Sequence, residues 1–90
     1  MSDPIRVILA EDHMIVREGL RALLEGRDDV VVVAEAEDGE AAVKAAAEHR
    51  PDVVVMDLNL PNLNGGDATK QIRKAQPDTH GLILSMYSTA

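Results

Sequence analysis

VVVMDLNLPNLNG, at residues 53–65, begins as a short apolar run and continues as a turn. Its first four residues, Val53–Met56, are apolar and mostly β-branched, and they run directly into Asp57. Such a run predicts a strand that is buried on both faces of a sheet. Asn62 and Asn64, in the polar part, are most simply turn formers. The stretch therefore predicts a buried strand whose carboxyl end carries an acidic side chain.

Three other apolar runs of similar length lie on either side of this stretch. They are Ile5–Ala10, Val30–Ala34 and Leu82–Met86. The first of these runs is followed by Glu11 and Asp12. Short apolar runs that are bounded by charges and turn residues predict strands. Together with residues 53–57 they give four predicted strands.

Helical patterns separate each predicted strand from the next. Apolar residues recur at helical spacing from Val16 to Leu24, and Gly26 ends the pattern. Asp38 can cap a second helix, from about Gly39 to His49, and Pro51 ends it. A third helix is predicted from about Gly66 to Ala75, and Pro77 ends it. Alternating strands and helices predict an α/β domain with a doubly wound parallel sheet.

The composition agrees with one small α/β domain and excludes several other kinds of protein. Hydrophobic residues make up 46% of the 90 residues, but Tyr87 is the single aromatic, so the core must be aliphatic. The net charge of −7 argues against nucleic-acid binding by these residues, and the lack of cysteine excludes disulfides and thiolate metal sites. The first residues reach charge too early for a signal peptide or a membrane span. We therefore expect a soluble, cytoplasmic domain.

Acidic and hydroxyl side chains stand where three of the predicted strands end. Glu11 and Asp12 follow the first strand, Asp57 ends the third, and Ser85 lies near the end of the fourth. The carboxyl ends of parallel strands meet at one edge of a sheet, and neighbouring strands are about 4.8 Å apart. If the first and third strands are neighbours, the carboxylates therefore converge. Two carboxylates about 4 Å apart repel by roughly 4 kcal/mol at an effective dielectric constant of about 20, so the site must bind a cation or keep a proton.

The ligands of this predicted site are all oxygen atoms, which favours Mg²⁺. A carboxylate that is fixed beside Mg²⁺ can act as a nucleophile toward a phosphoryl donor. Asp57 is the candidate nucleophile, and the Ser85 hydroxyl could hydrogen-bond the new phosphoryl group.

Simpler roles stay open for individual residues of the site. Glu11 and Asp12 alone could be a solvated strand end or a helix cap, and Ser85 could bond to nearby backbone. His13 follows the acidic pair, but an exposed histidine near a helix start is the better interpretation than a ligand.

Three other kinds of site fit the sequence poorly. Asp57, Asn59 and Asn64 suggest a calcium loop, but Ala68 stands where a bidentate Glu is required. A phosphatase with an aspartyl nucleophile would need a second Asp in place of Asn59. Flavin binding would need a Ser-, Thr- or Gly-rich phosphate loop after the first strand, where the sequence is EDHMIVRE.

Three segments of the sequence resemble the receiver domain of response regulators. They are AEDH at 10–13, VVVMDLNLPNLNG at 53–65 and LILSMY at 82–87. REGLRALLE at 17–25, MDLNLP and SMY are similar to the NarL/FixJ-type branch, whose members carry a C-terminal helix-turn-helix DNA-binding domain. The resemblance covers all 90 residues and implies the flavodoxin-like receiver fold, with strand order 2-1-3-4.

The resemblance also implies a role for each residue of the predicted site. Asp57 would be the phosphoacceptor, and Ser85 the switch hydroxyl that moves toward the phosphate. Asp12 would bind Mg²⁺ directly, Glu11 would act through water, and Asn59 would offer its backbone carbonyl to the metal.

The function that the resemblance implies is that of a phosphoacceptor in two-component signal transduction. A sensor histidine kinase would supply the phosphoryl group, and the domain would not be an enzyme, although it would assist its own phosphorylation and dephosphorylation. Phosphorylation would switch a helix-turn-helix transcriptional output domain, of which residues 1–90 hold no part. The alternative is a receiver-like interaction module that binds its partners without phosphorylation.

Receivers of this family continue through another helix, a fifth strand with a Lys and a switch Tyr or Phe, and a last helix. None of these follows Ala90 in this sequence, so we expect a partial receiver domain without the phosphate-pairing Lys. A sheet that ends at its fourth strand would have an unpaired edge. We therefore expect the 90-residue chain to self-associate.

Overall fold

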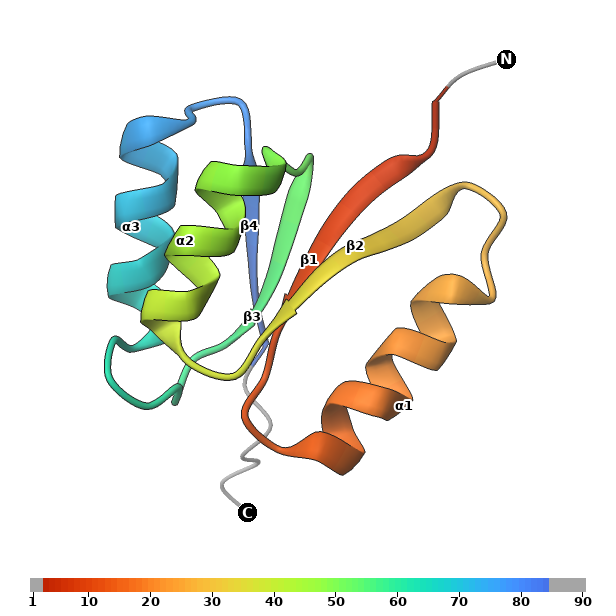
Figure 1. The fold of residues 1–90 in the computed structure, drawn as a ribbon, viewed down its shortest axis with the longest axis horizontal. Coiled ribbons are helices and arrows are strands. Elements are labelled where there is room, and N and C mark those ends of the chain that lie inside the picture. Colours follow the sequence, from red (N-terminus) through yellow and green to blue (C-terminus); the bar gives the residue numbers. More distant parts are fainter. Residues whose placement is uncertain (1–2, 85–90) are drawn as a thin grey trace.

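The computed structural model, which describes residues 3–84, consists of a four-stranded sheet and three helices (Figure 1). The elements follow one another as β1 (Ile5–Ala10), α1 (Met14–Glu25), β2 (Val30–Ala36), α2 (Gly39–His49), β3 (Val53–Asp57), α3 (Gly65–Ala75) and β4 (His80–Leu84). All paired strands are parallel, and their order in the sheet is β2-β1-β3-β4. The predicted α/β fold class and strand order are therefore confirmed.

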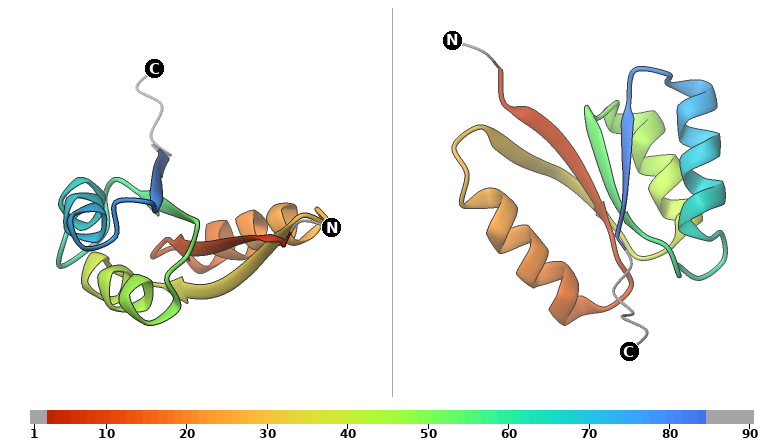
Figure 2. Two further views of the ribbon diagram at one scale, coloured as in Figure 1. Left: turned by 90° about the horizontal axis from the view of Figure 1, so that it is seen from above. Right: turned by 180° about the vertical axis from the view of Figure 1, so that it is seen from behind.

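Helices cover both faces of the sheet (Figure 2). α2 and α3 pack together on the face where β1 and β3 present Ile8, Val54 and Met56, and small alanines of the two helices complete this core. α1 packs on the opposite face, over Val7 and Leu9. The central strands are thus apolar on both sides, as the continuous apolar runs predicted. None of the helices in residues 3–84 has the length and apolar character that a bilayer crossing requires.

The strand pairing brings the carboxyl ends of β1 and β3 together. Ala10 is paired with Met56, so Glu11 and Asp57 follow side by side at the same edge of the sheet. On the other side of β1, Ala10 is paired with Ala36 of β2. The predicted convergence of the two acidic strand ends therefore follows directly from the register.

The observed bounds differ from the predicted ones at two strands. β2 extends to Ala36, two residues beyond the predicted Ala34, because it stays paired with β1 after a register shift between Val7 and Ile8. β4 begins at His80 rather than Leu82, because its first residues pair with Val53 and the residue after it. The predicted end of this strand at Met86 lies outside the described residues.

Two asparagines that the sequence suggested as turn formers have different roles. Asn62 has a positive φ of 68°, the left-handed conformation that turns use. Asn64 is instead the N-cap of α3, because its side chain accepts a hydrogen bond of 2.9 Å from the amide of Asp67. This cap starts α3 at Gly65, one residue before the predicted Gly66.

Two glycines within helices have opposite surroundings. Gly19 lies in α1, and an added Cβ would meet nothing within 4 Å. Gly39 begins α2, where an added Cβ would overlap the carbonyl oxygen of Leu63 in the β3–α3 loop. The Gly39 amide donates to the carbonyl of Pro61 at 3.3 Å in the same loop. The missing side chain at position 39 thus allows the loop after Asp57 to lie directly against α2.

These surroundings predict opposite effects of the same substitution. Gly19→Ala should raise the free energy of unfolding by about 0.5–1 kcal/mol, because alanine restricts the unfolded chain and has open space in the folded one. Gly39→Ala should lower it by about 2 kcal/mol, because backbone must move to make room for the methyl group. Urea unfolding followed by circular dichroism measures both. A destabilised Gly19→Ala variant would contradict the open space beside Gly19, and an unaffected Gly39→Ala variant would contradict the close contact of Gly39 with Leu63.

Candidate functional site

Four side chains that can bind a cation gather at the carboxyl ends of β1 and β3. Glu11, Asp12, His13 and Asp57 each offer one ligand atom, and these atoms all lie within 4.8 Å of one another. The sequence predicted the convergence of the three carboxylates. It did not predict that His13 would join them.

Asp57 and Glu11 are the two buried acidic residues of this cluster, and each is 2% exposed. The Oδ1 atom of Asp57 accepts a hydrogen bond of 3.1 Å from the backbone amide of Asn59. Its Oδ2 atom is buried and has no hydrogen-bond partner among residues 3–84. Leaving a buried polar atom unpaired costs about 1–3 kcal/mol, and more for a charged group. Within the described residues, Asp57 therefore has an unpaired oxygen atom beside the other ligand atoms of the cluster.

Glu11 and Asp12 both face the imidazole of His13. Oε1 of Glu11 accepts a hydrogen bond of 3.0 Å from the His13 amide and lies 2.8 Å from Nδ1 of the ring. Oδ1 of Asp12 lies 3.2 Å from the same nitrogen, and the Asp12 side chain is 30% exposed. The turn after β1 thus folds back so that residue 13 contacts the two residues before it.

These contacts raise the pKa of His13 above its ordinary value of 6.5, first through the hydrogen bond to Glu11 and then through the charge of Asp12, with smaller contributions from the charges of Glu11 and Asp57. The ring itself is 59% exposed, as predicted for a histidine at a helix start. A protonated His13 would offset part of the negative charge of the cluster. A cation that binds the carboxylates would compete with it.

The loop after Asp57 is fixed by short backbone contacts. The amide of Gly65 donates to the carbonyl of Leu58 at 3.0 Å, and an added Cβ at Gly65 would overlap the carbonyl oxygen of Asp57. The side-chain amide of Asn62 donates to Oδ2 of Asp38, the N-cap of α2, at 3.0 Å. The loop is thus held close to the end of β3 and to the start of α2.

Two predicted site residues are less fully described. Asn59 is exposed and donates its amide to Asp57, while a role for its carbonyl as a metal ligand stays a prediction. Ser85 lies outside the described residues.

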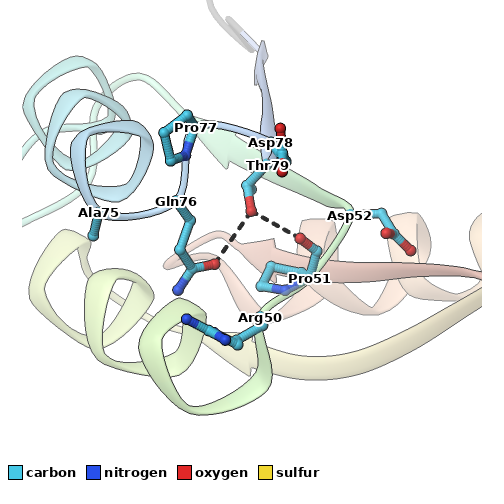
Figure 3. A pocket seen from close by; sticks show the side chains of 8 residues that line it. All are labelled: Arg50, Pro51, Asp52, Ala75, Gln76, Pro77, Asp78 and Thr79. Carbon is cyan, nitrogen blue, oxygen red and sulfur yellow. Dashed lines mark hydrogen bonds between the residues drawn. The ribbon is translucent and has the colours of Figure 1, made fainter.

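A hollow of about 340 Å³ lies at the opposite end of the sheet, lined by residues 50–52 and 75–79 (Figure 3). The side chains of Gln76 and Thr79 in its lining are engaged with each other and with backbone. The Thr79 hydroxyl donates to the carbonyl of Pro51 at 2.9 Å and lies 3.2 Å from Oε1 of Gln76. Nε2 of Gln76 donates to the carbonyl of Ala46 at 2.8 Å. Parallel α/β sheets bind ligands at the carboxyl ends of their strands, which is the other end of this sheet. The acidic cluster is therefore the better candidate for a functional site.

Known proteins share both this fold and much of this sequence. The response regulator receiver domain family matches residues 7–90. The transcriptional regulatory protein YdfI of Bacillus subtilis (strain 168) is 43% identical over 83 residues, which are 92% of this chain and 38% of that protein. The chain thus spans less than half the length of this curated relative.

Solved structures of response regulators also resemble this chain. The receiver domain of the putative response regulator NarL from Mycobacterium tuberculosis superposes with a TM-score of 0.91 at 32% identity, covering 97% of this chain and 70% of that one. A two-component response regulator of the LuxR family from Aurantimonas sp. SI85-9A1 superposes with a TM-score of 0.89 at 44% identity, covering 96% of this chain and 61% of that one. With its strand order and its acidic sheet edge, the chain belongs to the response regulator receiver domain family of two-component signalling.

Proposed function

We propose that the chain accepts a phosphoryl group on Asp57, in the presence of Mg²⁺, from the phosphohistidine of a sensor histidine kinase. The observation that carries this proposal is the buried, unpartnered Oδ2 atom of Asp57 within residues 3–84, beside the carboxylates of Glu11 and Asp12. Membership of the receiver family supports it.

The residues of the acidic cluster fit Mg²⁺. Carboxylate and carbonyl oxygens are its preferred protein ligands, and Glu11, Asp12 and Asp57 supply carboxylates at one edge of the sheet. We infer that these three residues hold the ion, Glu11 through water, together with the backbone carbonyl of Asn59. When bound, Mg²⁺ neutralises negative charge on the phosphoryl oxygens.

The side chain of Asp57 is prepared for attack on phosphorus. Its orientation is fixed by the hydrogen bond from the Asn59 amide to Oδ1, which reduces the entropy lost on reaching the reactive geometry. A carboxylate oxygen forms a bond to phosphorus while the phosphorus–nitrogen bond of the phosphohistidine breaks. The electron pair of that bond stays with the leaving imidazole, which takes up a proton from solvent.

Phosphorylation would change the charge at this edge of the sheet. An added phosphoryl group carries roughly two negative charges near neutral pH and strong acceptor oxygens. We infer that Ser85 hydrogen-bonds this group. We also infer that the resulting change in the conformation of the domain acts on a helix-turn-helix transcriptional output domain outside residues 1–90. The chain would then be the receiver part of a cytoplasmic transcription regulator.

Phosphorylation can be tested directly by intact-mass spectrometry. The chain incubated with Mg²⁺ and acetyl phosphate should gain one phosphoryl group, and Asp57→Asn should gain none. Asp78→Asn is the matched control, because it removes the same charge from an exposed position before β4, and it should be phosphorylated like the unmodified chain.

The other outcomes distinguish the two candidate functions. A gain that persists in Asp57→Asn would assign the phosphoryl group to another residue. If neither the 90-residue chain nor a longer chain that includes the following residues gains a phosphoryl group, the result would favour a module that binds its partners without phosphorylation.

The stability of the metal-free protein should also report on the charge of Asp57. Asp57→Asn should raise the free energy of unfolding in EDTA by about 1–2 kcal/mol, because it removes a buried charge from the cluster and keeps an oxygen for the Asn59 amide. Asp78→Asn should change it by less than about 0.5 kcal/mol, as surface substitutions usually do. Urea unfolding measures both values. A less stable Asp57→Asn variant would mean that the carboxylates do not strain the folded state.

A further inference from the structure

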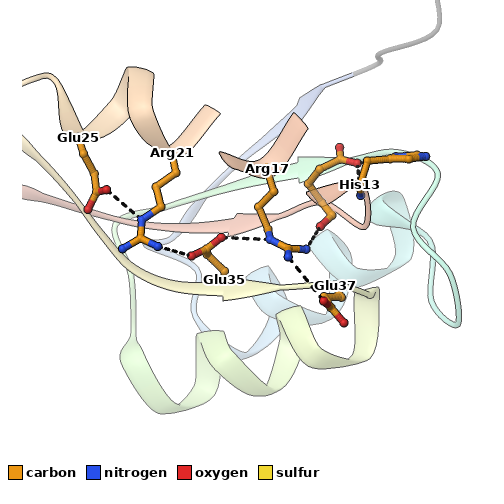
Figure 4. Close-up of polar contacts among 7 residues, drawn as sticks. His13, Arg17, Arg21, Glu25, Glu35 and Glu37 are labelled. Atoms are coloured by element: carbon orange, nitrogen blue, oxygen red, sulfur yellow. Dashed lines mark hydrogen bonds and ion pairs between the residues drawn. The ribbon is translucent and has the colours of Figure 1, made fainter. Parts of the chain in front are cut away.

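The guanidinium of Arg17 connects the end of β1 to the end of β2 (Figure 4). Its Nη1 donates to the backbone carbonyl of Glu11 at 2.9 Å. Its Nε lies 3.1 Å from Oε1 of Glu35, and its Nη2 lies 3.5 Å from Oε1 of Glu37. Each nitrogen thus has a partner of its own, and the side chain is only 12% exposed. A planar guanidinium held at three points is a rigid support for the group it binds.

The contact with Glu11 matters because the carbonyl of Glu11 and the amide of Asp12 belong to one planar peptide unit. On the other side of Glu11, its amide donates to the carbonyl of Ala36 at 3.0 Å, which continues the pairing of β1 with β2. After Glu11 this pairing ends, and Asp12 lies in a bend. Arg17 therefore holds the backbone at the point where the strand no longer does.

We propose that Arg17 is a positioning residue for the metal site. By holding the peptide unit between Glu11 and Asp12, its guanidinium keeps their two carboxylates directed toward Asp57 against their mutual repulsion. Arg17 touches neither the ion nor the phosphoryl group in this role. The inference rests on the proposed function, because it requires that the acidic cluster binds Mg²⁺.

Arg21 provides a matched control on the same helix. Its Nη1 lies 2.9 Å from Oε2 of Glu35, and its Nε lies 2.9 Å from Oε1 of Glu25. Both arginines therefore pair α1 with β2 through Glu35, but the contacts of Arg21 within residues 3–84 do not include Glu11. Comparing the two separates an effect on Glu11 from a general loss of ion pairs.

The test is a Mg²⁺ titration of the 90-residue chain, followed by the amide NMR signals of Glu11, Asp12 and Asp57. Arg17→Met should weaken Mg²⁺ binding by about tenfold, the lower end of what the loss of a residue that orients a metal ligand causes. It should also shift the Asp12 amide signal before Mg²⁺ is added. Arg21→Met should bind Mg²⁺ like the unmodified chain.

Glu35→Gln adds a second comparison, because it weakens the ion pairs of both arginines but leaves the guanidinium of Arg17 free to bind Glu11. It should keep most of the Mg²⁺ affinity. If Arg17→Met does not fold, Arg17→Lys replaces it, because a single ammonium cannot serve the carbonyl and both carboxylates. Arg17→Lys should also bind Mg²⁺ more weakly than Arg21→Met.

Three results would overturn the proposal in different ways. Equal Mg²⁺ affinity of the unmodified chain and the Arg17 variant would show that Glu11 and Asp12 need no such support. Equal weakening by Arg17→Met and by Arg21→Met or Glu35→Gln would assign the effect to the ion pairs between α1 and β2. An unmodified chain that does not bind Mg²⁺ would overturn the proposed function, and this inference with it.

Discussion

The parallel pairing of β1 with β3 forces like charges together at one edge of the sheet. Because Ala10 is paired with Met56, Glu11 and Asp57 follow on neighbouring strands, and both side chains are buried. Carboxylates in such a position repel each other more strongly than they would in water. Two neighbouring side chains act against this repulsion. His13 faces the carboxylates from one side, and Arg17 holds the backbone that carries two of them.

Among residues 3–84, Oδ2 of Asp57 is buried without a hydrogen-bond partner, which is a local cost to stability and is typical of a reactive or metal-binding group. Residues that are kept in unfavourable surroundings require a rigid structure around them. Here the loop after Asp57 is fixed by Gly65 on one side and by the contact of Gly39 with Leu63 on the other. The fold thus stabilises an arrangement that its acidic residues alone would not adopt.

The sequence was sufficient to predict those features that depend on local pattern. The bounds of α2 and β3 agree with the prediction, because Asp38 and the run of apolar residues before Asp57 mark them clearly. The convergence of Glu11 with Asp57 was predicted on the condition that the first and third strands are neighbours, which is the order that the resemblance to receivers implied and that the structure has. The positions of His13 and Arg17 were not predictable in the same way. They depend on how the turn after β1 folds back and on how α1 lies across the sheet, and neither leaves a periodic signal.

The most direct test of this account is the free energy of unfolding of the chain as a function of Mg²⁺ concentration, at constant ionic strength. If the acidic cluster binds Mg²⁺ only in the folded state, stability should rise by up to about 1.4 kcal/mol for each tenfold increase in Mg²⁺ above the dissociation constant. Asp57→Asn, which lacks one of the charges, should gain less. Equal stability of the unmodified chain in Mg²⁺ and in K⁺ at the same ionic strength would contradict the account.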